Sequence, residues 1–329
     1  MLIRTVLLIV PLIGVAVASG SSDGGWLLVA NKGEHTLGMI DPSAGRQVTA
    51  IAESGVTGHE VVASPDGKVA FVPIYGNSGV GLPGTDGRTI DVVDLQQRRV
   101  VHKIEFDHGV RPHCAVFGPK DGMLYVTTEL DKSIAVIDLH TYQIVGNIPT
   151  GEAESHMLAI SPDGRVGYTA NVGPGTVSVL DMEGRKTSTV IKVANHVQRI
   201  SVSPDGRWIF TSDTEKPRLA VIDGKTNKVD RWIDLPGEGY GSASTPDDKW
   251  LLIAMPSANG VAVIDLASLR VVKTINVPAA PQEVLIRPDG QLAYVSCDRS
   301  HQVAAISLSD WSVKLIEAGK SADGLAWAQ

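Results

Sequence analysis

Three histidines, His59, His113 and His156, are the residues of this sequence whose type and spacing most directly suggest chemistry. Each opens a short, mostly apolar run that ends in a turn of the Ser-Pro-Asp-Gly type or a variant of it. Three imidazoles brought to one point could bind Zn²⁺ or Cu²⁺ and leave a coordination position open for catalysis. We therefore predict a three-histidine site for a divalent metal, copper or zinc. The alternative is that each histidine caps its own strand by bonding to neighbouring backbone.

The elements that must position these histidines are short strands in a repeating unit. Runs rich in Val, Ile, Tyr and Thr and bounded by Pro, Asp and Gly turns are typical of antiparallel strands. After a longer first spacing, the unit recurs about every 42 residues, which is the period of a four-stranded propeller blade. The turns open at Ser64, Gly118, Ser161, Ser203, Thr245 and Arg287.

The number of units predicts an all-β, seven-bladed β-propeller with four-stranded blades. Six complete copies of the first strand are followed by a seventh, Asp323–Ala328, at the end of the chain. Three strands at Trp26–Ala52 lack a first strand of their own. We expect the ring to close by pairing the C-terminal strand with the N-terminal three, which leaves only short edges exposed.

Alignment of the copies places polar residues around the mouth of the central channel. The three histidines share a ring with Gln198, Tyr240, Gln282 and Asp323, and the adjoining ring includes Glu60, Arg199 and Glu283. Polar groups that converge on a rigid scaffold are a good binding-site hypothesis. The predicted ligand-binding residues are Glu60, Arg111, Arg199, Tyr240, Gln282 and Glu283.

Arg199 and Tyr240 are also the candidate catalytic residues. A guanidinium at the mouth suits a carboxylate or phosphate group, and a tyrosine could donate a proton or stack on a ligand. The alternative for Arg199 is an ion pair with Glu283, Asp213 or Glu129. The alternative for Tyr240 is simple packing with its hydroxyl in water.

An insertion at Tyr75–Arg88 contains a formal Gly-x-Gly-x-x-Gly pattern that is not a dinucleotide-binding fingerprint. That fingerprint needs a helix directly after it, whereas Pro83 and a predicted strand follow here. Because the insertion joins the second and third strands of its blade, we expect it on the same face as the histidines. It is either a rim or lid over the channel or an exposed decoration.

The N-terminus has the pattern of a secretory signal peptide. Arg4 precedes an apolar run that ends in Ala16-Val17-Ala18, which is too short for a spanning helix. We predict a signal peptide at 1–18 and a single propeller domain at 19–329, periplasmic or secreted, monomeric and without a membrane span after cleavage; an uncleaved anchor is the alternative. Export would permit a disulfide, but Cys114 and Cys297 fall in non-neighbouring units and are expected to be free thiols.

The repeats also resemble the YVTN seven-bladed propeller family. Tyr125–Thr128, Tyr168–Asn171 and Tyr294–Cys297 are similar to its Y-V-T-N strand. Its Ser-Pro-Asp-Gly-Arg turns and V-x-V-I-D strands also appear in this chain, as at Val261–Asp265. The resemblance implies the propeller fold and an exported protein. It implies no activity, because related propellers include binding proteins, lactonases, lyases and copper or haem oxidoreductases.

Two functions follow as expectations. The first is an exported binding protein whose channel mouth receives a small molecule, a metal ion or a protein of the cell envelope. The second is a metal-dependent lyase, lactonase or oxidoreductase that uses the same residues. Nucleic acid is not an expected partner, because the net charge of −7 supplies no overall basic balance for phosphate binding.

Overall fold

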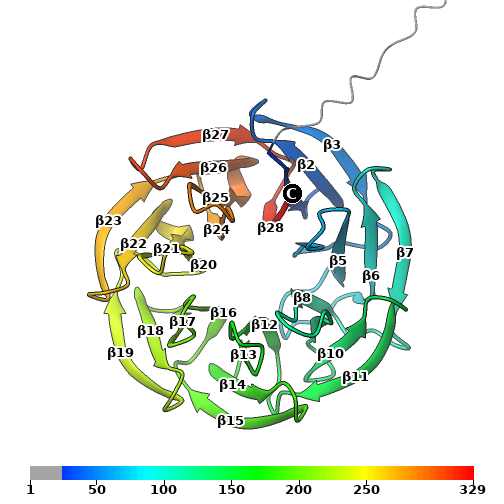
Figure 1. Ribbon diagram of the computed structural model, residues 1–329, viewed down its shortest axis with the longest axis horizontal. Coiled ribbons are helices and arrows are strands. Elements are labelled where there is room, and N and C mark those ends of the chain that lie inside the picture. The colour runs from blue at the N-terminus through cyan, green and yellow to red at the C-terminus, as the bar shows by residue number, and fades with distance from the viewer. Residues whose placement is uncertain (1–23) are drawn as a thin grey trace, which may run out of the picture.

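The computed structural model describes residues 24–329, and the predicted signal peptide at 1–18 lies outside the described residues. The described residues form seven four-stranded blades around a central axis (Figure 1). The prediction of a seven-bladed propeller is therefore confirmed. Within residues 24–329, no helix is long and apolar enough to cross a membrane.

Each blade runs from an inner strand at the axis to an outer strand at the perimeter. We number the blades from one to seven in chain order. The first three contain β28 (Ala322–Ala328), β1 (Trp26–Asn31), β2 (Thr36–Asp41) and β3 (Arg46–Ala52); then β4 (Val62–Ala63), β5 (Val69–Gly76), β6 (Asp86–Asp94) and β7 (Arg99–Glu105); then β8 (Pro112–Phe117), β9 (Leu124–Thr128), β10 (Ser133–Asp138) and β11 (Gln143–Pro149).

The remaining four blades follow the same order. They contain β12 (Ser155–Ile160), β13 (Val166–Asn171), β14 (Thr176–Asp181) and β15 (Lys186–Lys192); β16 (Val197–Val202), β17 (Trp208–Asp213), β18 (Arg218–Asp223) and β19 (Lys228–Asp234); β20 (Ser242–Ser244), β21 (Trp250–Met255), β22 (Gly260–Asp265) and β23 (Arg270–Asn276); and β24 (Pro281–Ile286), β25 (Leu292–Cys297), β26 (Gln302–Ser307) and β27 (Val313–Glu317). Two short 3₁₀ turns, Pro256–Ala258 and Asp298–Ser300, join strands in the last two blades.

The ring closes in the first blade, as the sequence predicts. C-terminal β28 pairs antiparallel with β1, with Leu27 opposite Trp327 and Leu28 opposite Ala326. The two ends of the described chain therefore meet in one sheet, which Figure 1 shows as red β28 beside blue β2.

Middle strands are buried on both faces because neighbouring blades pack against each side of them. In β9 and β17 every residue is buried, whereas outer strands such as β7 and β11 are mostly exposed. The apolar core is therefore distributed between facing blades rather than gathered at one centre. Cys114 and Cys297 are buried free thiols, as expected.

The repeated turns are held by the hydrogen bonds that their sequence predicts. In the second blade, Ser64 Oγ donates to Asp66 Oδ1 at 2.6 Å, and Gly67 has φ of +65°. The same Ser-to-Asp bond recurs at Ser161 and Asp163, also at 2.6 Å. Each turn sends the chain from an inner strand to the second strand and fixes where the inner strand begins at the axis.

Candidate functional site

The three histidines lie together at the mouth of the channel, where the inner strands begin. His113 belongs to β8 and His156 to β12, while His59 precedes β4. The rings of His113 and His156 have centroids 3.6 Å apart with an interplanar angle of 32°. His59 meets His113 edge to face, with centroids 5.4 Å apart. The repeat thus brings residues from three successive blades into direct contact.

The predicted three-histidine metal site is not found. In the described part of the chain, no group of three His, Cys, Asp or Glu side chains is arranged to hold a metal ion. The physical reason is the stacking of His113 on His156. Lone pairs of an imidazole lie in the plane of the ring, so two rings packed one against the other at a tilt of 32° do not direct their nitrogens between them at a common ion.

Burial keeps these imidazoles neutral. Desolvation is the largest effect on each, and it lowers the pKa of His59 to about 4 and the pKa of His113 and His156 well below 6.5. The nearby cation Arg199 acts in the same direction on all three. Neutral imidazoles at physiological pH are available as hydrogen-bonding groups rather than as charges.

Two imidazole nitrogens are buried without a partner. His113 and His156 are 2% and 3% exposed, and the Nδ1 atom of each lacks a hydrogen bond to any described residue. Gln198 donates its amide to His156 Nε2 at 3.4 Å, which places the proton of that neutral ring on Nδ1. A buried N–H without a hydrogen-bond partner lowers the stability of the fold, so we expect an acceptor for this nitrogen.

Acidification is expected to destabilise the protein through these histidines. Below about pH 6.5 the histidines bind protons in the unfolded chain but stay neutral in the folded protein. The free energy of unfolding is therefore highest above that pH and decreases as the pH falls toward 4. The loss is about 1.4 kcal/mol per pH unit for each histidine that remains neutral in the fold. Urea unfolding at pH 7.5, 6 and 5 should show a shallower slope for the double variant His113→Phe/His156→Phe than for the wild type.

The matched control for this experiment is His140→Phe, because the His140 side chain is 96% exposed. Its pH slope should equal that of the wild type. Burial raises the pKa of Glu60, an effect of opposite sign, but that residue is present in every protein compared. Equal slopes for the wild type and the double variant would contradict the neutral, buried state of the histidines.

Tyr75, at the end of β5, packs among the three histidines. Its ring centroid lies 4.8 Å from that of His59, 5.2 Å from that of His113 and 6.0 Å from that of His156. The Tyr75 hydroxyl donates to Glu129, a buried carboxylate that follows β9. Tyr75 therefore forms one wall of the mouth and ties it to the third blade.

The insertion that begins at Tyr75 is pinned over this wall. Arg111, buried and with φ of +52°, pairs with Asp86 at 2.7 Å and with Glu129 at 3.0 Å. Nη2 donates to the carbonyl of Leu82 at 2.8 Å, and Nη1, which also contacts Glu129, donates to that of Gly79 at 3.4 Å. Arg111, predicted as a ligand-binding residue, therefore hydrogen-bonds to the insertion and to Glu129 through its guanidinium nitrogens.

The insertion also reaches the neighbouring blades. Gly81 has φ of +69° and donates its N–H to Glu129 Oε1 at 3.1 Å. A Cβ atom at this position would lie 2.6 Å from Glu154 Oε1, just before β12. The positive φ and the nearby Glu154 carboxylate favour glycine here, and the loop extends from the second blade toward the fourth at the histidine end of the channel.

Arg199 spans the channel and holds three carboxylates. It lies in β16, and its guanidinium is 2.7 Å from Glu60, 3.0 Å from Asp323 and 3.2 Å from Glu283. Asp323 belongs to β28, on the opposite side of the ring in Figure 1. One of the ion pairs considered from sequence, that with Glu283, is therefore formed, together with two more.

Burial and mutual charge set the protonation of this cluster. Desolvation, reinforced by the nearby carboxylates of Glu283 and Asp323, raises the pKa of Glu60 well above 4.5 although Arg199 opposes it. Asp323 is also desolvated, but Lys32 at 2.9 Å and Arg199 lower its pKa. For Arg199, the carboxylates outweigh burial and raise the pKa.

Tyr240 and Gln282 lie beside this cluster. The Arg199 guanidinium carbon is 5.0 Å from the centre of the Tyr240 ring, a cation–π contact. Gln282 is half-buried and donates its amide to the carbonyl of Ala280 at 3.3 Å. All six predicted ligand-binding residues therefore border the mouth or the channel, but Arg111 and Arg199 are fully engaged by protein groups.

Three further residues belong to this region, and the sequence does not predict the role of any of them. Tyr75, Glu129 and Lys32 each lie at or just after the end of a second strand, and Glu129, considered from sequence as a partner of Arg199, pairs with Arg111 instead. A signal for Tyr75 was present, since it is the aromatic end of the run Val72-Pro73-Ile74. The roles of Lys32 and Glu129 depend on side-chain reach across blades, which repeat alignment does not give.

Comparisons with known proteins agree on the fold. A family model described as Cytochrome D1 heme domain matches residues 117–235, about a third of the chain. The seven-bladed beta-propeller protein Rv1057 of Mycobacterium tuberculosis is 26% identical over 138 residues, which cover 41% of this chain and 32% of that protein. The chain thus matches about a third of the length of that relative.

A solved structure extends the likeness to most of the ring. The structure of Hydrazine Synthase from Kuenenia stuttgartiensis superposes with a TM-score of 0.74 and 20% identity, covering 88% of this chain and 94% of that one. At this identity the likeness concerns the fold alone.

Proposed function

We propose that this seven-bladed propeller is an exported binding protein that holds a small polar molecule at the histidine end of its channel. The observation that carries the proposal is the pair of buried Nδ1 atoms of His113 and His156 without partners. Buried polar atoms in folded proteins almost always have a partner, either in the protein or in something that it binds. Export rests on the predicted signal peptide.

The chemistry of the mouth indicates a ligand that accepts hydrogen bonds. His156 presents an N–H at Nδ1 because Gln198 occupies its other nitrogen. Tyr75 supplies an aromatic wall, and the insertion pinned by Arg111 supplies a cover. A carbonyl or carboxylate oxygen held under the cover would satisfy the imidazole N–H while the ring of Tyr75 packs against the rest of the molecule.

A haem does not fit the axis of this chain, although the matching family model carries that name. Arg199 crosses the channel to Glu60 and Asp323, so a macrocycle at the axis would have to displace these buried ion pairs. His113 and His156 are also buried and packed against each other, which leaves no open face of the channel beside their rings. Among the alternatives, binding is favoured over catalysis because the guanidinium of the candidate catalytic Arg199 is already paired with three carboxyl groups.

Native mass spectrometry of the exported protein tests the proposal. Protein purified without chelators or denaturation should carry one small molecule per chain, released when the protein is unfolded. The variant His156→Phe keeps the ring packing but loses the N–H, and should be isolated without the molecule. The exposed variant His140→Phe should retain it.

Two results would overturn the proposal. One is that the wild type, His156→Phe and His140→Phe all have the mass of the polypeptide alone. In that case the ¹⁵N chemical shift of His156 Nδ1 in the wild type would also be the same before unfolding and after refolding, because no molecule was lost. The other is a metal ion bound at one per chain and lost in His156→Phe, which would replace a polar molecule by a metal centre.

A further inference from the structure

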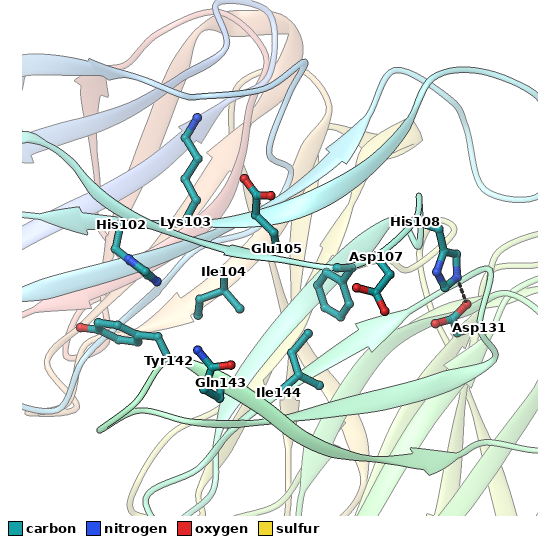
Figure 2. A pocket seen from close by; sticks show the side chains of 11 residues that line it. His102, Lys103, Ile104, Glu105, Asp107, His108, Asp131, Tyr142, Gln143 and Ile144 are labelled. Carbon is teal, nitrogen blue, oxygen red and sulfur yellow. Dashed lines mark hydrogen bonds and ion pairs between the residues drawn. The ribbon is translucent and has the colours of Figure 1, made fainter.

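A groove on the perimeter separates the outer strands of the second and third blades. It has a volume of about 570 Å³ and lies between β7 and the start of β11. Figure 2 shows His102, Ile104 and Glu105 on one side and Tyr142, Gln143 and Ile144 on the other. This groove is remote from the axis and has no part in the proposed function.

One wall of the groove is the free edge of a sheet. β7 is the last strand of its blade: one of its edges pairs with β6, and the other edge pairs with no strand of that sheet. Phe106 N donates to Arg88 O at 2.9 Å, so backbone groups of alternate residues face β6. The carbonyls of Lys103 and Glu105 consequently face away from it, as does that of Val101 before the bulge. In the described residues, no side chain donates to these carbonyls.

The next blade shows how such an edge is closed. At the β11–β15 junction, Arg185 donates to the carbonyl of Val145 at 3.2 Å, and Thr187 Oγ1 donates to that of Pro149 at 2.6 Å. In the repeat, Val145 and Pro149 correspond to Val101 and Glu105 of β7. Arg185 and Thr187 correspond to Tyr142 and Ile144 of β11, and both Arg185 and Tyr142 have positive φ.

Tyr142 and Ile144, which stand where the next blade has Arg185 and Thr187, leave the β7 edge without side-chain donors. Ile144 has no hydrogen-bond donor in its side chain, and Tyr142 stacks on His102 with ring centroids 5.0 Å apart. The groove is therefore left with unpaired backbone on one wall and apolar and aromatic groups on the other. Open edges of this kind are templates for another strand.

We propose that this groove docks an extended segment of a partner protein, which adds a strand to the free edge of β7. Alternate N–H groups of an extended chain repeat at the spacing of the outward carbonyls of β7, so the backbone alone satisfies them. Side chains that point inward contact Ile104 and Ile144, while the stacked His102 and Tyr142 close one end.

The charges of the groove favour a basic segment. Glu105, Asp107 and Asp131 line its far end, against Lys103 and the imidazole of His108, which is 2.8 Å from Asp131. Even with Arg88, which lies 4.0 Å from Glu105, the carboxylates outnumber the permanent cations and complement lysine or arginine on the incoming strand. The partner is accordingly an extended segment that alternates basic and apolar residues.

Fluorescence anisotropy with a labelled eight-residue peptide of alternating arginine and valine tests the proposal. Binding should be saturable, and should weaken at least tenfold when alternate backbone nitrogens of the peptide are methylated. An alternating glutamate and valine peptide should bind at least tenfold more weakly than the basic one. Equal binding of the methylated peptide, or of the acidic one, would overturn the proposal, as would absence of binding at 1 mM.

A variant that copies the neighbouring junction locates the site. Tyr142→Arg/Ile144→Thr should reduce binding at least tenfold, because the new side chains cap the β7 edge. The single variant Ile144→Thr, tested with it, should show part of the loss even if the double variant folds poorly. The control Asn227→Arg/Val229→Thr makes the same changes at the equivalent positions before and within β19, two blades further on, and should bind as the wild type does. Undiminished binding by both groove variants would overturn the assignment.

Discussion

Replacing Arg199 by methionine is expected to destabilise the protein by about 3 to 5 kcal/mol, because removal of one partner strands buried charges. Arg199 is 6% exposed, and Glu60 and Asp323 are each 5% exposed. Methionine matches much of the volume but offers no donors, so Glu60 would lose its ion-pair partner and Asp323 would keep only Lys32. Urea unfolding at pH 7.5 measures the loss.

The matched control for this variant is Arg231→Met. Arg231 pairs with Asp230 at 2.6 Å, but the Arg231 side chain is 54% exposed, and exposed pairs contribute about 0 to 1 kcal/mol. A second variant, Arg199→Met/Glu60→Gln, removes the carboxyl group left without an ion-pair partner and should recover part of the stability. A loss below about 1 kcal/mol for Arg199→Met would contradict the central role of this ion-pair cluster.

A chain that ends at Ser321, and so lacks β28, is expected to lose cooperative folding. β28 supplies the inner strand of the first blade, and Leu325, Ala326 and Ala328 are each at most 5% exposed. Without it, the edge of β1 and the apolar faces of the first, second and seventh blades become exposed. Open edges and apolar patches of that size promote aggregation.

Circular dichroism during heating, together with size-exclusion chromatography, measures the effect of this truncation. The truncated chain should show no sharp thermal transition and should elute as aggregate. A chain that lacks only Gln329 keeps every residue of β28 and should behave as the full chain does. A truncated chain with the midpoint and elution volume of the full chain would show that the ring does not depend on this closure.

The architecture was accessible from sequence because it depends on local signals that repeat. Ser-Pro-Asp-Gly turns recur at nearly constant spacing, and their hydrogen bonds are local to each turn, as between Ser64 and Asp66. The unmatched strands at the two ends then leave one way to complete a seventh blade. Conclusions of this kind need only the pattern of residue types along the chain.

The site was only partly accessible for the opposite reason. Repeat alignment places His113 and His156 side by side, but whether two imidazoles stack or converge on an ion depends on rotamers and packing. The same limit applies to Arg199: its type suggested an ion pair, but three partners from three blades depend on reach across the axis. The open edge of β7 appears only when its contacts are compared with those of β11.

The ion pairs that Arg199 makes across the ring also affect how a small molecule could move through the central channel. Arg199 reaches across the channel to Glu60 and Asp323, so a solute that passed from one face to the other would have to separate these ion pairs. At the histidine end, the insertion lies next to the channel mouth, and its position depends on Arg111. If a ligand exchanges only at this end, its rates of binding and release would both depend on how often the insertion moves away, and loss of the Arg111 contacts would raise both rates.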